Sequence, residues 1–424
     1  MHAFIIGIGD ELTLGQTVDT NSPWLSEQLT ALGIPVLGHL IVPDDRAATA
    51  AAIRLAASLA DLVLVTGGLG PTQDDLTRDA LADAAGVPLE ERPDALAAVA
   101  AWFQHHQRPM SASNRVQALC PRGADWLDND CGTAPGLRVR VGQAKVYAFP
   151  GVPREMKAMF LRHLAPTLAV QSGGVILTRT IRTFGEGESQ IGERLGDLMR
   201  RGSNPVIGTT VSLGVVSIRV RSEAPTRTGA EAAIQTAVAE IQSRLGNLIF
   251  GEDDETLARV VGRLLKDRGM TLATAESCTG GGVAAQITDM PGSSAWFRGG
   301  WVVYTNALKT TALGVPETMI AEHGAVSEPV ARAMAGGALE RSGADCVLAL
   351  TGIAGPDGGT PEKPVGTVWI ALGVPGQGLP VLTAQRFLFP GDRAAVRDRA
   401  GKTALNLLRH ALGSRAVGLI SATF

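Results

Sequence analysis

Aromatic residues are scarce in this 424-residue chain, and its cysteines are few and scattered. Phe, Trp and Tyr make up 4% of the residues, whereas 45% are apolar and 51 are Gly. This balance is typical of α/β layers with glycine-rich functional loops. The four cysteines, at positions 120, 131, 278 and 346, lie far apart and form no C-x-x-C pair. They argue against a zinc knuckle and for a reducing compartment, so we expect a cytoplasmic protein.

The chain also lacks a signal-like segment and a basic cluster. The apolar run Ala3–Ile8 is followed at once by Asp10 and Glu11, and it is too short for a signal peptide or a membrane span. It therefore predicts a buried first strand and no membrane partner. The net charge is −3, the pI is about 6.2, and no Lys or Arg run forms a polybasic patch. We expect no nucleic-acid partner.

The length exceeds that of one typical domain of roughly 100–200 residues, and the pattern of turns divides the chain into blocks at 1–170, 171–251 and 252–424. In the first and third blocks strands alternate with helices, which predicts α/β folds with a parallel sheet and helices on both faces. The middle block is predicted to be a small α+β connector without chemistry of its own. In the first block we expect helices opened by Asn21-Ser22-Pro23 and by Asp44 or Asp45, and strands at 3–8, 36–42, 62–66, 137–141 and 144–149.

A glycine-rich segment follows the predicted strand 62–66. It reads Gly67-Gly68-Leu69-Gly70-Pro71-Thr72-Gln73-Asp74-Asp75-Leu76-Thr77. Glycines allow the backbone to approach a phosphate, and the next helix presents its N-terminus to the anion. Carboxylates beside such a loop would repel a phosphate unless a divalent cation intervenes, so Asp74 or Asp75 suggests Mg²⁺ or a related ion such as Co²⁺. One of the two is alternatively the helix N-cap. Asp10, Glu11 and Asp19 either complete this site or are solvated.

The third block contains a candidate serine nucleophile. An apolar stretch ends in Glu276-Ser277-Cys278-Thr279-Gly280-Gly281-Gly282, which predicts a strand that turns sharply into a helix with the Ser277 hydroxyl at the turn. Free N–H groups beside it would suit an oxyanion. An ordinary strand-to-helix loop is the alternative, and Cys278 is the rival nucleophile.

Lys309 and Tyr304 are the candidate base and proton relay for this serine. Free Lys has a pKa of about 10.4, so a lysine base needs a lowered pKa. If Asn306 caps the helix after Tyr304, Lys309 lies in the first turn, where the helix dipole lowers its pKa, and burial would add to this. The alternative for Lys309 is an ordinary surface lysine.

Arg393 and Arg397 stand four residues apart on the predicted last helix and therefore share a face. They are candidates to bind the phosphate of a nucleotide. Asp392 and Asp398 leave surface salt bridges as the alternative.

Several of these segments together resemble the competence/damage-inducible CinA family. In the N-terminal half the resemblance lies in Gly9-Asp10-Glu11-Leu12, Asp19-Thr20-Asn21, Gly67 to Thr77, Gly132 to Gly136 and Pro150-Gly151-Val152-Pro153. In the C-terminal half it lies in Glu276 to Gly281, Gly292 to Phe297, Gly324 to Glu328 and Thr351 to Gly359. It covers essentially the whole chain.

The resemblance implies a doubly wound domain similar to molybdopterin-binding proteins, a KH-like connector and a C-terminal nicotinamide-nucleotide amidase domain. It implies a bifunctional hydrolase that deamidates nicotinamide mononucleotide and, with a divalent metal, cleaves ADP-ribose. The implied site residues are Ser277, Lys309 and Tyr304 in catalysis; Thr279, Gly280, Gly281, Asn306, Gly352, Ala354, Gly355, Arg393 and Arg397 around the amide substrate; Gly67, Gly68, Gly70, Thr72 and Asn21 around phosphate; and Asp74, Asp75 and Glu11 on the metal.

We expect a homodimer, and no cofactor for the amidase. Two other readings stay open. In one, the N-terminal block binds a pterin or nucleotide without catalysis. In the other, the protein is an interaction partner in competence or recombination.

Overall fold

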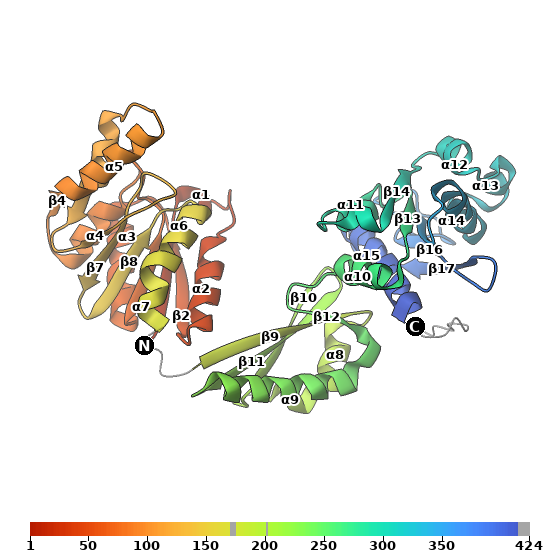
Figure 1. Ribbon diagram of the computed structural model, residues 1–424, viewed down its shortest axis with the longest axis horizontal. Helices are drawn as coiled ribbons and strands as arrows, with labels where there is room; N and C mark the ends of the chain where they lie inside the picture. Colours follow the sequence, from red (N-terminus) through yellow and green to blue (C-terminus); the bar gives the residue numbers. More distant parts are fainter. Residues whose placement is uncertain (170–174, 201, 414–424) are drawn as a thin grey trace. The chain divides into compact units, whose positions relative to one another are not determined.

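The computed structural model describes residues 1–169, 175–200 and 202–413 (Figure 1). These residues form three sheets of four or more strands, each built from a consecutive stretch of chain. The strand orders are β2-β1-β3-β8-β7-β6, β10-β11-β9-β12 and β14-β13-β15-β16-β17. The last strand of the middle sheet ends at Glu252, one residue beyond the predicted boundary at 251.

The first sheet forms because its central strands are short, continuous apolar runs. Every residue of β1 and β3 is buried, as expected for strands covered on both faces. The first four strands in the sheet order run parallel, and β7 and β6 are antiparallel to their neighbours. The strands are β1 Ala3–Ile8, β2 Val36–Val42, β3 Leu62–Thr66, β6 Asp125–Leu127, β7 Gly136–Val141 and β8 Ala144–Phe149, with β4 Leu89–Glu91 and β5 Leu119–Pro121 forming a separate pair.

Two helical layers cover this sheet. Because side chains of a strand alternate between faces, Ile6 of β1 packs into a cluster with α3 and α4, whereas Ile5 packs with α2, α6 and the segment that follows it. The helices are α1 Asp10–Thr13, α2 Asn21–Ala31, α3 Arg46–Leu59, α4 Thr77–Ala85, α5 Pro93–His105, α6 Pro153–Met159 and α7 Ala165–Ala169.

The middle sheet is small and carries two helices. Its strands are β9 Val175–Phe184, β10 Val206–Ser212, β11 Val215–Ala224 and β12 Ile249–Glu252, and its helices are α8 Glu188–Leu195 and α9 Arg227–Leu245. The α helix α8 ends at Leu195 and is followed by a 3-10 helix from Gly196 to Met199.

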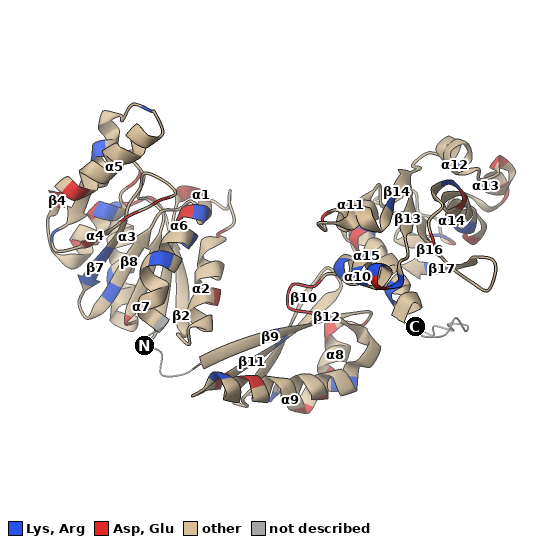
Figure 2. Cartoon of the chain, in the orientation of Figure 1, with Lys and Arg blue, Asp and Glu red and all other residues tan. Residues whose placement is uncertain are grey.

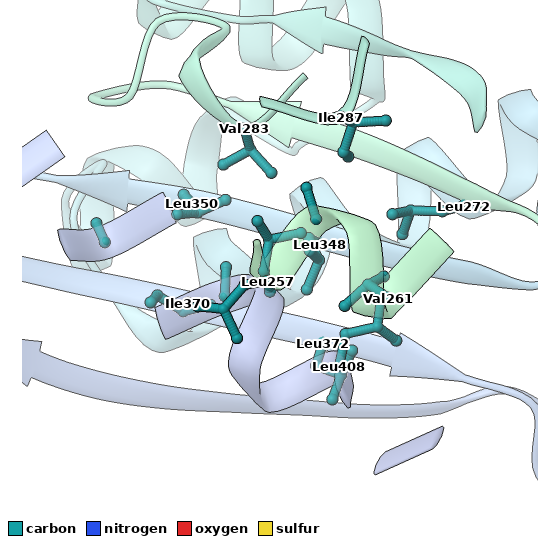
Figure 3. Close-up of a cluster of buried hydrophobic side chains, with 14 of the residues drawn as sticks. Leu257, Val261, Leu272, Val283, Ile287, Leu348, Leu350, Ile370, Leu372 and Leu408 are labelled. Carbon is teal, nitrogen blue, oxygen red and sulfur yellow. The ribbon is translucent and has the colours of Figure 1, made fainter. Parts of the chain in front are cut away.

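The third sheet is again covered on both faces. Figure 3 shows the cluster on one face, where Leu257 and Val261 of α10 and Leu408 of α15 pack against Leu348 of β15 and Ile370 of β16. The other face packs against α12 to α14. The strands are β13 Leu272–Glu276, β14 Phe297–Val302, β15 Cys346–Gly352, β16 Thr367–Val374 and β17 Val381–Leu388, and the helices are α10 Leu257–Arg268, α11 Gly282–Thr288, α12 Asn306–Leu313, α13 Glu317–His323, α14 Glu328–Ser342 and α15 Arg393–Gly413.

The topology predicts where ligands bind in the first and third sheets. In the first, β1 lies between β2 and β3; in the third, β13 lies between β14 and β15, and all three strands of each set are parallel. The strand order therefore reverses at β1 and at β13, and open α/β sheets bind ligands outside the carboxyl ends of strands at such points. Ser277 follows β13 directly, and Glu11 follows β1.

The expected α/β fold class is confirmed, with corrections in detail. Both α/β sheets are mixed rather than wholly parallel, because the last strands of each return as antiparallel meanders. The helix α2 is not capped by its own Asn21: the Asp19 carboxylate accepts from the amides of Asn21 and Ser22. Within the described ranges, the helices are all too short or too polar to span a bilayer.

Candidate functional sites

The Ser277 turn is a tight strand-to-helix connection, as the glycine run predicts. Ser277 donates its amide to Leu350 O at 2.9 Å, and its own carbonyl accepts from the Gly280 amide at 3.0 Å. Gly280 and Gly281 have φ of 60° and 88°, a conformation that residues with a Cβ rarely adopt. Ser277 is buried, with 7% of its surface exposed.

Glu276 holds the start of α11, a role that the sequence did not predict. This carboxylate is buried, and its two oxygens accept from the amides of Val283 at 3.0 Å and Ala284 at 2.9 Å. A carboxylate at a helix N-terminus satisfies amides that have no partner within the helix. These two amides are therefore not available to a substrate oxygen.

Lys309 points at the serine from the neighbouring connection. Its Nζ lies 3.2 Å from Ser277 Oγ and donates to Val303 O at 3.1 Å, and only 2% of the residue is exposed. Burial lowers the pKa of Lys309, because an apolar environment disfavours the ammonium. In the parts of the chain that the structure describes, no carboxylate forms an ion pair with it.

The helix that carries Lys309 begins as expected, but its cap differs. The Thr305 hydroxyl accepts from the Leu308 amide at 3.2 Å, so Thr305 is the N-cap of α12 and the predicted Asn306 is its exposed first residue. Because the Thr305 hydroxyl already satisfies the Leu308 amide, Asn306 does not cap the helix. Lys309 still lies in the first turn.

The predicted oxyanion donors are only partly available. The Gly280 amide is committed to the Ser277 carbonyl, which corrects its expected role. The amides of Thr279 and Gly281 donate to no oxygen within residues 1–169, 175–200 and 202–413. These two remain as candidate donors beside Ser277.

Arg393 and Arg397 at the start of α15 both form hydrogen bonds with uncharged groups of the site. Arg393 donates to Gly355 O at 2.7 Å and to the Tyr304 hydroxyl at 2.6 Å, and Arg397 donates to Thr279 O at 2.8 Å. The predicted alternative of surface salt bridges is wrong, since Asp392 caps the helix at Ala395 and Asp398 pairs with Lys402. No carboxylate in the described ranges offsets either guanidinium.

The predicted relay through Tyr304 has no hydrogen bond to support it in the described residues. The Tyr304 hydroxyl accepts from Arg393 rather than contacting Lys309, and half of the residue is exposed. Tyr304 lies with two further exposed apolar residues, Val302 and Leu308, on the same connection. Its hydroxyl is therefore placed to meet a ligand together with Arg393.

Gly352 and Ala354, which were also predicted around the amide substrate, have structural roles. Gly352 ends β15 where a Cβ would come within 2.7 Å of Thr367 O, so strand pairing alone accounts for this glycine. Ala354 is part of the buried core. Cys278 is buried, and burial raises the pKa of its thiol to about 12, so it is protonated at neutral pH.

A second candidate site is a cavity of about 420 Å³ in the first block. It is lined by the glycine loop, the loop after β1 and the loop after β8; the lining includes Gly67, Gly68, Leu69, Gly70, Glu11, Asp44, Asp74, Asp75, Gln117, Thr133, Gly151 and Glu155. Two predicted phosphate ligands lie outside the lining. The Thr72 amide donates a hydrogen bond to the Asp75 carboxylate. The side-chain amide of Asn21 donates to the Thr66 hydroxyl and to Gly151 O.

The carboxylates of this cavity differ in their hydrogen bonds and in their surroundings. Asp75 accepts from the Gly70 amide at 2.7 Å and from Thr72, so it fixes the loop rather than capping α4. Burial raises the pKa of Asp44, and the charges of nearby Glu11 and Asp74 add to the rise. Within the described residues no three His, Cys, Asp or Glu side chains form a metal cluster. The donor set fits an ion such as Mg²⁺, which takes one or two carboxylates and completes its shell with substrate phosphate and water.

Residues of both charge signs are interspersed along the described helices and strands (Figure 2). On α9 of the middle part, Arg227 pairs with Glu231 and Arg244 pairs with Glu240. Such pairs leave this helix without the uniform basic face that nucleic-acid binding uses.

Three family models match the chain. They describe a probable molybdopterin binding domain at residues 4–170, a damage-inducible protein CinA KH domain at 178–251 and a CinA C-terminal domain at 254–412. A putative competence-damage inducible protein of Symbiobacterium thermophilum is 49% identical over 421 residues, which are 97% of this chain and 99% of the relative. A CinA-like protein of Citrifermentans bemidjiense is 44% identical, covering 98% of each chain. A crystal structure of a CinA superfamily protein from Klebsiella pneumoniae is 39% identical and covers 37% of this chain and 96% of that one, with a TM-score of 0.35.

Proposed function

The chain belongs to the CinA family, as the sequence predicted, and we propose that its C-terminal part is a serine amidase that deamidates nicotinamide mononucleotide. One observation carries this proposal: Lys309 Nζ lies 3.2 Å from Ser277 Oγ, and both residues are buried. A nucleophile within hydrogen-bond reach of a base is the arrangement that acyl transfer requires. A lysine whose charged form is disfavoured by burial is suited to be that base.

In the proposed reaction neutral Lys309 accepts the Ser277 proton as Oγ attacks the carboxamide carbon. The oxyanion that forms accepts hydrogen bonds from the free amides of Thr279 and Gly281. Collapse breaks the C–N bond, and the Lys309 ammonium returns its proton to the leaving nitrogen as ammonia. Water then attacks the Ser277 ester with Lys309 as base, which releases the carboxylic acid and restores the hydroxyl.

The two arginines at the start of α15 support a phosphorylated substrate. Among the described residues Arg393 and Arg397 contact only carbonyl and hydroxyl oxygens, so neither positive charge is offset and both can attract an anion. Guanidinium groups bind phosphate through paired hydrogen bonds. The arginines would hold the nucleotide phosphate while the amide lies at Ser277.

The substrate assignment is tested by measuring ammonia release from nicotinamide mononucleotide, nicotinamide riboside and nicotinamide. We expect the mononucleotide to have the highest kcat/KM, because the other two lack the phosphate. Equal kcat/KM for the mononucleotide and the riboside would refute the phosphate assignment, and no ammonia from any of the three would refute the amidase.

For the N-terminal part we propose metal-dependent hydrolysis of the diphosphate of ADP-ribose, which the acidic, glycine-lined cavity supports. Glu11 and Asp74 would hold the cation, whose chemistry is to polarise phosphoryl oxygens. Release of AMP and ribose 5-phosphate tests this activity. Binding of ADP-ribose without cleavage would favour the non-catalytic binding module instead. The names of the relatives suggest a role in competence or DNA damage; a salt-dependent DNA titration tests that reading.

A further inference from the structure

The N-terminal cavity presents an electrostatic problem for a diphosphate. Its lining holds the carboxylates of Glu11, Asp44, Asp74, Asp75 and Glu155, and none of the described residues that line it is Lys or Arg. One divalent cation balances two of these charges at most. A polyanion in this cavity requires a further positive group.

That group lies directly behind the glycine loop. Arg78, on the first turn of α4, is 2% exposed and donates to Gly70 O at 3.1 Å and to Leu69 O. Burial lowers the pKa of Arg78 to about 10, so it remains charged at neutral pH. Its Nε has no hydrogen-bond partner, and no carboxylate lies within ion-pair distance among the residues that the structure describes.

The neighbouring Thr77 donates hydrogen bonds to the two preceding carbonyls of the loop. Its hydroxyl donates to Gly67 O at 2.8 Å, and its amide donates to Gly68 O at 3.1 Å. Thr77 and Arg78 together bind four successive carbonyl oxygens, those of residues 67 to 70. The loop therefore turns its carbonyls toward α4.

Because each peptide unit is planar, the direction of its carbonyl fixes the direction of its amide N–H. In a trans peptide the N–H points opposite to the C=O of the same unit. The amides of Gly68 and Leu69 share peptide units with the carbonyls that Thr77 binds, and within the described ranges neither donates to another group. Both residues line the cavity.

We propose that Arg78, with Thr77, is a positioning residue for anion binding: it turns the amides of Gly68 and Leu69 toward a bound phosphate and supplies the positive charge that the cavity lining lacks. This inference rests on the proposed diphosphate chemistry of the cavity and adds a residue that does not itself touch the ligand. It predicts that anion affinity depends on a side chain outside the cavity lining.

The test is isothermal titration of the full-length protein with inorganic pyrophosphate in the presence of Mg²⁺. Arg78→Met keeps the chain length and removes the charge, and we expect affinity to fall by about tenfold or more. Arg78→Lys restores the charge but not the two carbonyl contacts, so its affinity should lie between those of wild type and Arg78→Met. The matched control is Arg46→Met, which removes an exposed arginine that pairs with Asp79 and Asp83 of the same helix. This control should bind within about twofold of wild type.

Thermal unfolding of each variant separates binding from folding. A folded Arg78→Met that binds pyrophosphate within twofold of wild type would overturn the inference. If that variant does not fold, Thr77→Val at the same titration decides, with a loss of about threefold or more expected and unchanged affinity contradicting us. Wild-type protein that binds no pyrophosphate would also overturn the inference, whereas binding of ADP-ribose without cleavage would refute only the proposed hydrolysis.

Discussion

Replacing Lys309 with Met should abolish amidase activity and yet stabilise the fold at neutral pH. The lysine is 2% exposed, and within the described part of the chain its ammonium contacts only Val303 O and Ser277 Oγ. Burying an unpaired charge costs several kcal/mol, and the two hydrogen bonds return about 1 kcal/mol each. Met has a similar length and no charge. We therefore expect Lys309→Met to be more stable by about 1–2 kcal/mol at pH 7, after allowing for these lost hydrogen bonds.

The pH dependence gives the sign of the effect. Burial lowers the pKa of Lys309 in the folded state, whereas an unfolded lysine keeps a pKa of about 10.4. Between these two values the unfolded state binds more protons, so the stability of wild type rises with pH through that window. The advantage of Lys309→Met is thus complete below the lowered pKa and disappears above about pH 10.4.

The assay is thermal unfolding of both proteins from pH 6 to pH 10, followed through the transition of the C-terminal part. For a domain of this size a change of 1 kcal/mol shifts Tm by about 2–4 °C, so the variant should unfold at the higher temperature at pH 7. A variant less stable than wild type at pH 7, or a difference that does not change with pH, would refute the view that Lys309 is destabilised by burial of its charge.

Three further predictions follow from the two sites. Tyr304→Phe should raise KM for nicotinamide mononucleotide by about threefold to tenfold with a smaller change in kcat, because it removes the oxygen that Arg393 contacts; a large loss of kcat at unchanged KM would restore the proton relay. EDTA should abolish diphosphate cleavage and leave ammonia release intact, and equal loss of both would show that the metal is misplaced. A fragment from Glu252 to Phe424 should release ammonia but unfold at a lower temperature, because Phe184 and Phe250 of the middle part belong to its core cluster; an inactive soluble fragment would contradict this.

The Ser277 turn and the glycine loop were predictable because each combines an apolar strand with glycines that need a particular backbone. The pairing of Lys309 with Ser277 depended on two parallel strands ending side by side, which alternation of strands and helices predicts. Buried polar contacts were harder to predict from the sequence. Glu276 looks like the solvated end of a strand, but its carboxylate caps a helix that begins six residues later.

The role of Arg78 was missed for the same reason. An arginine on the first turn of a helix is ordinarily expected to be a surface cation, and only the folded loop shows that its guanidinium donates to the carbonyls of Leu69 and Gly70. Caps were displaced by one or two residues, from Asn306 to Thr305 and from Asn21 to Asp19, because several neighbouring side chains can each satisfy the same amides.

Ammonia release by Ser277→Ala at saturating nicotinamide mononucleotide tests the central claim most directly, with Cys278→Ala as the matched control at the adjacent position. A serine mechanism predicts that Ser277→Ala loses about three or more orders of magnitude in kcat while the fold is kept, and that Cys278→Ala loses about tenfold or less. The buried thiol of Cys278, whose pKa is raised to about 12, is not ionised at the pH of the assay. Near-normal turnover by Ser277→Ala together with loss in Cys278→Ala would contradict the account and make this protein a thiol amidase.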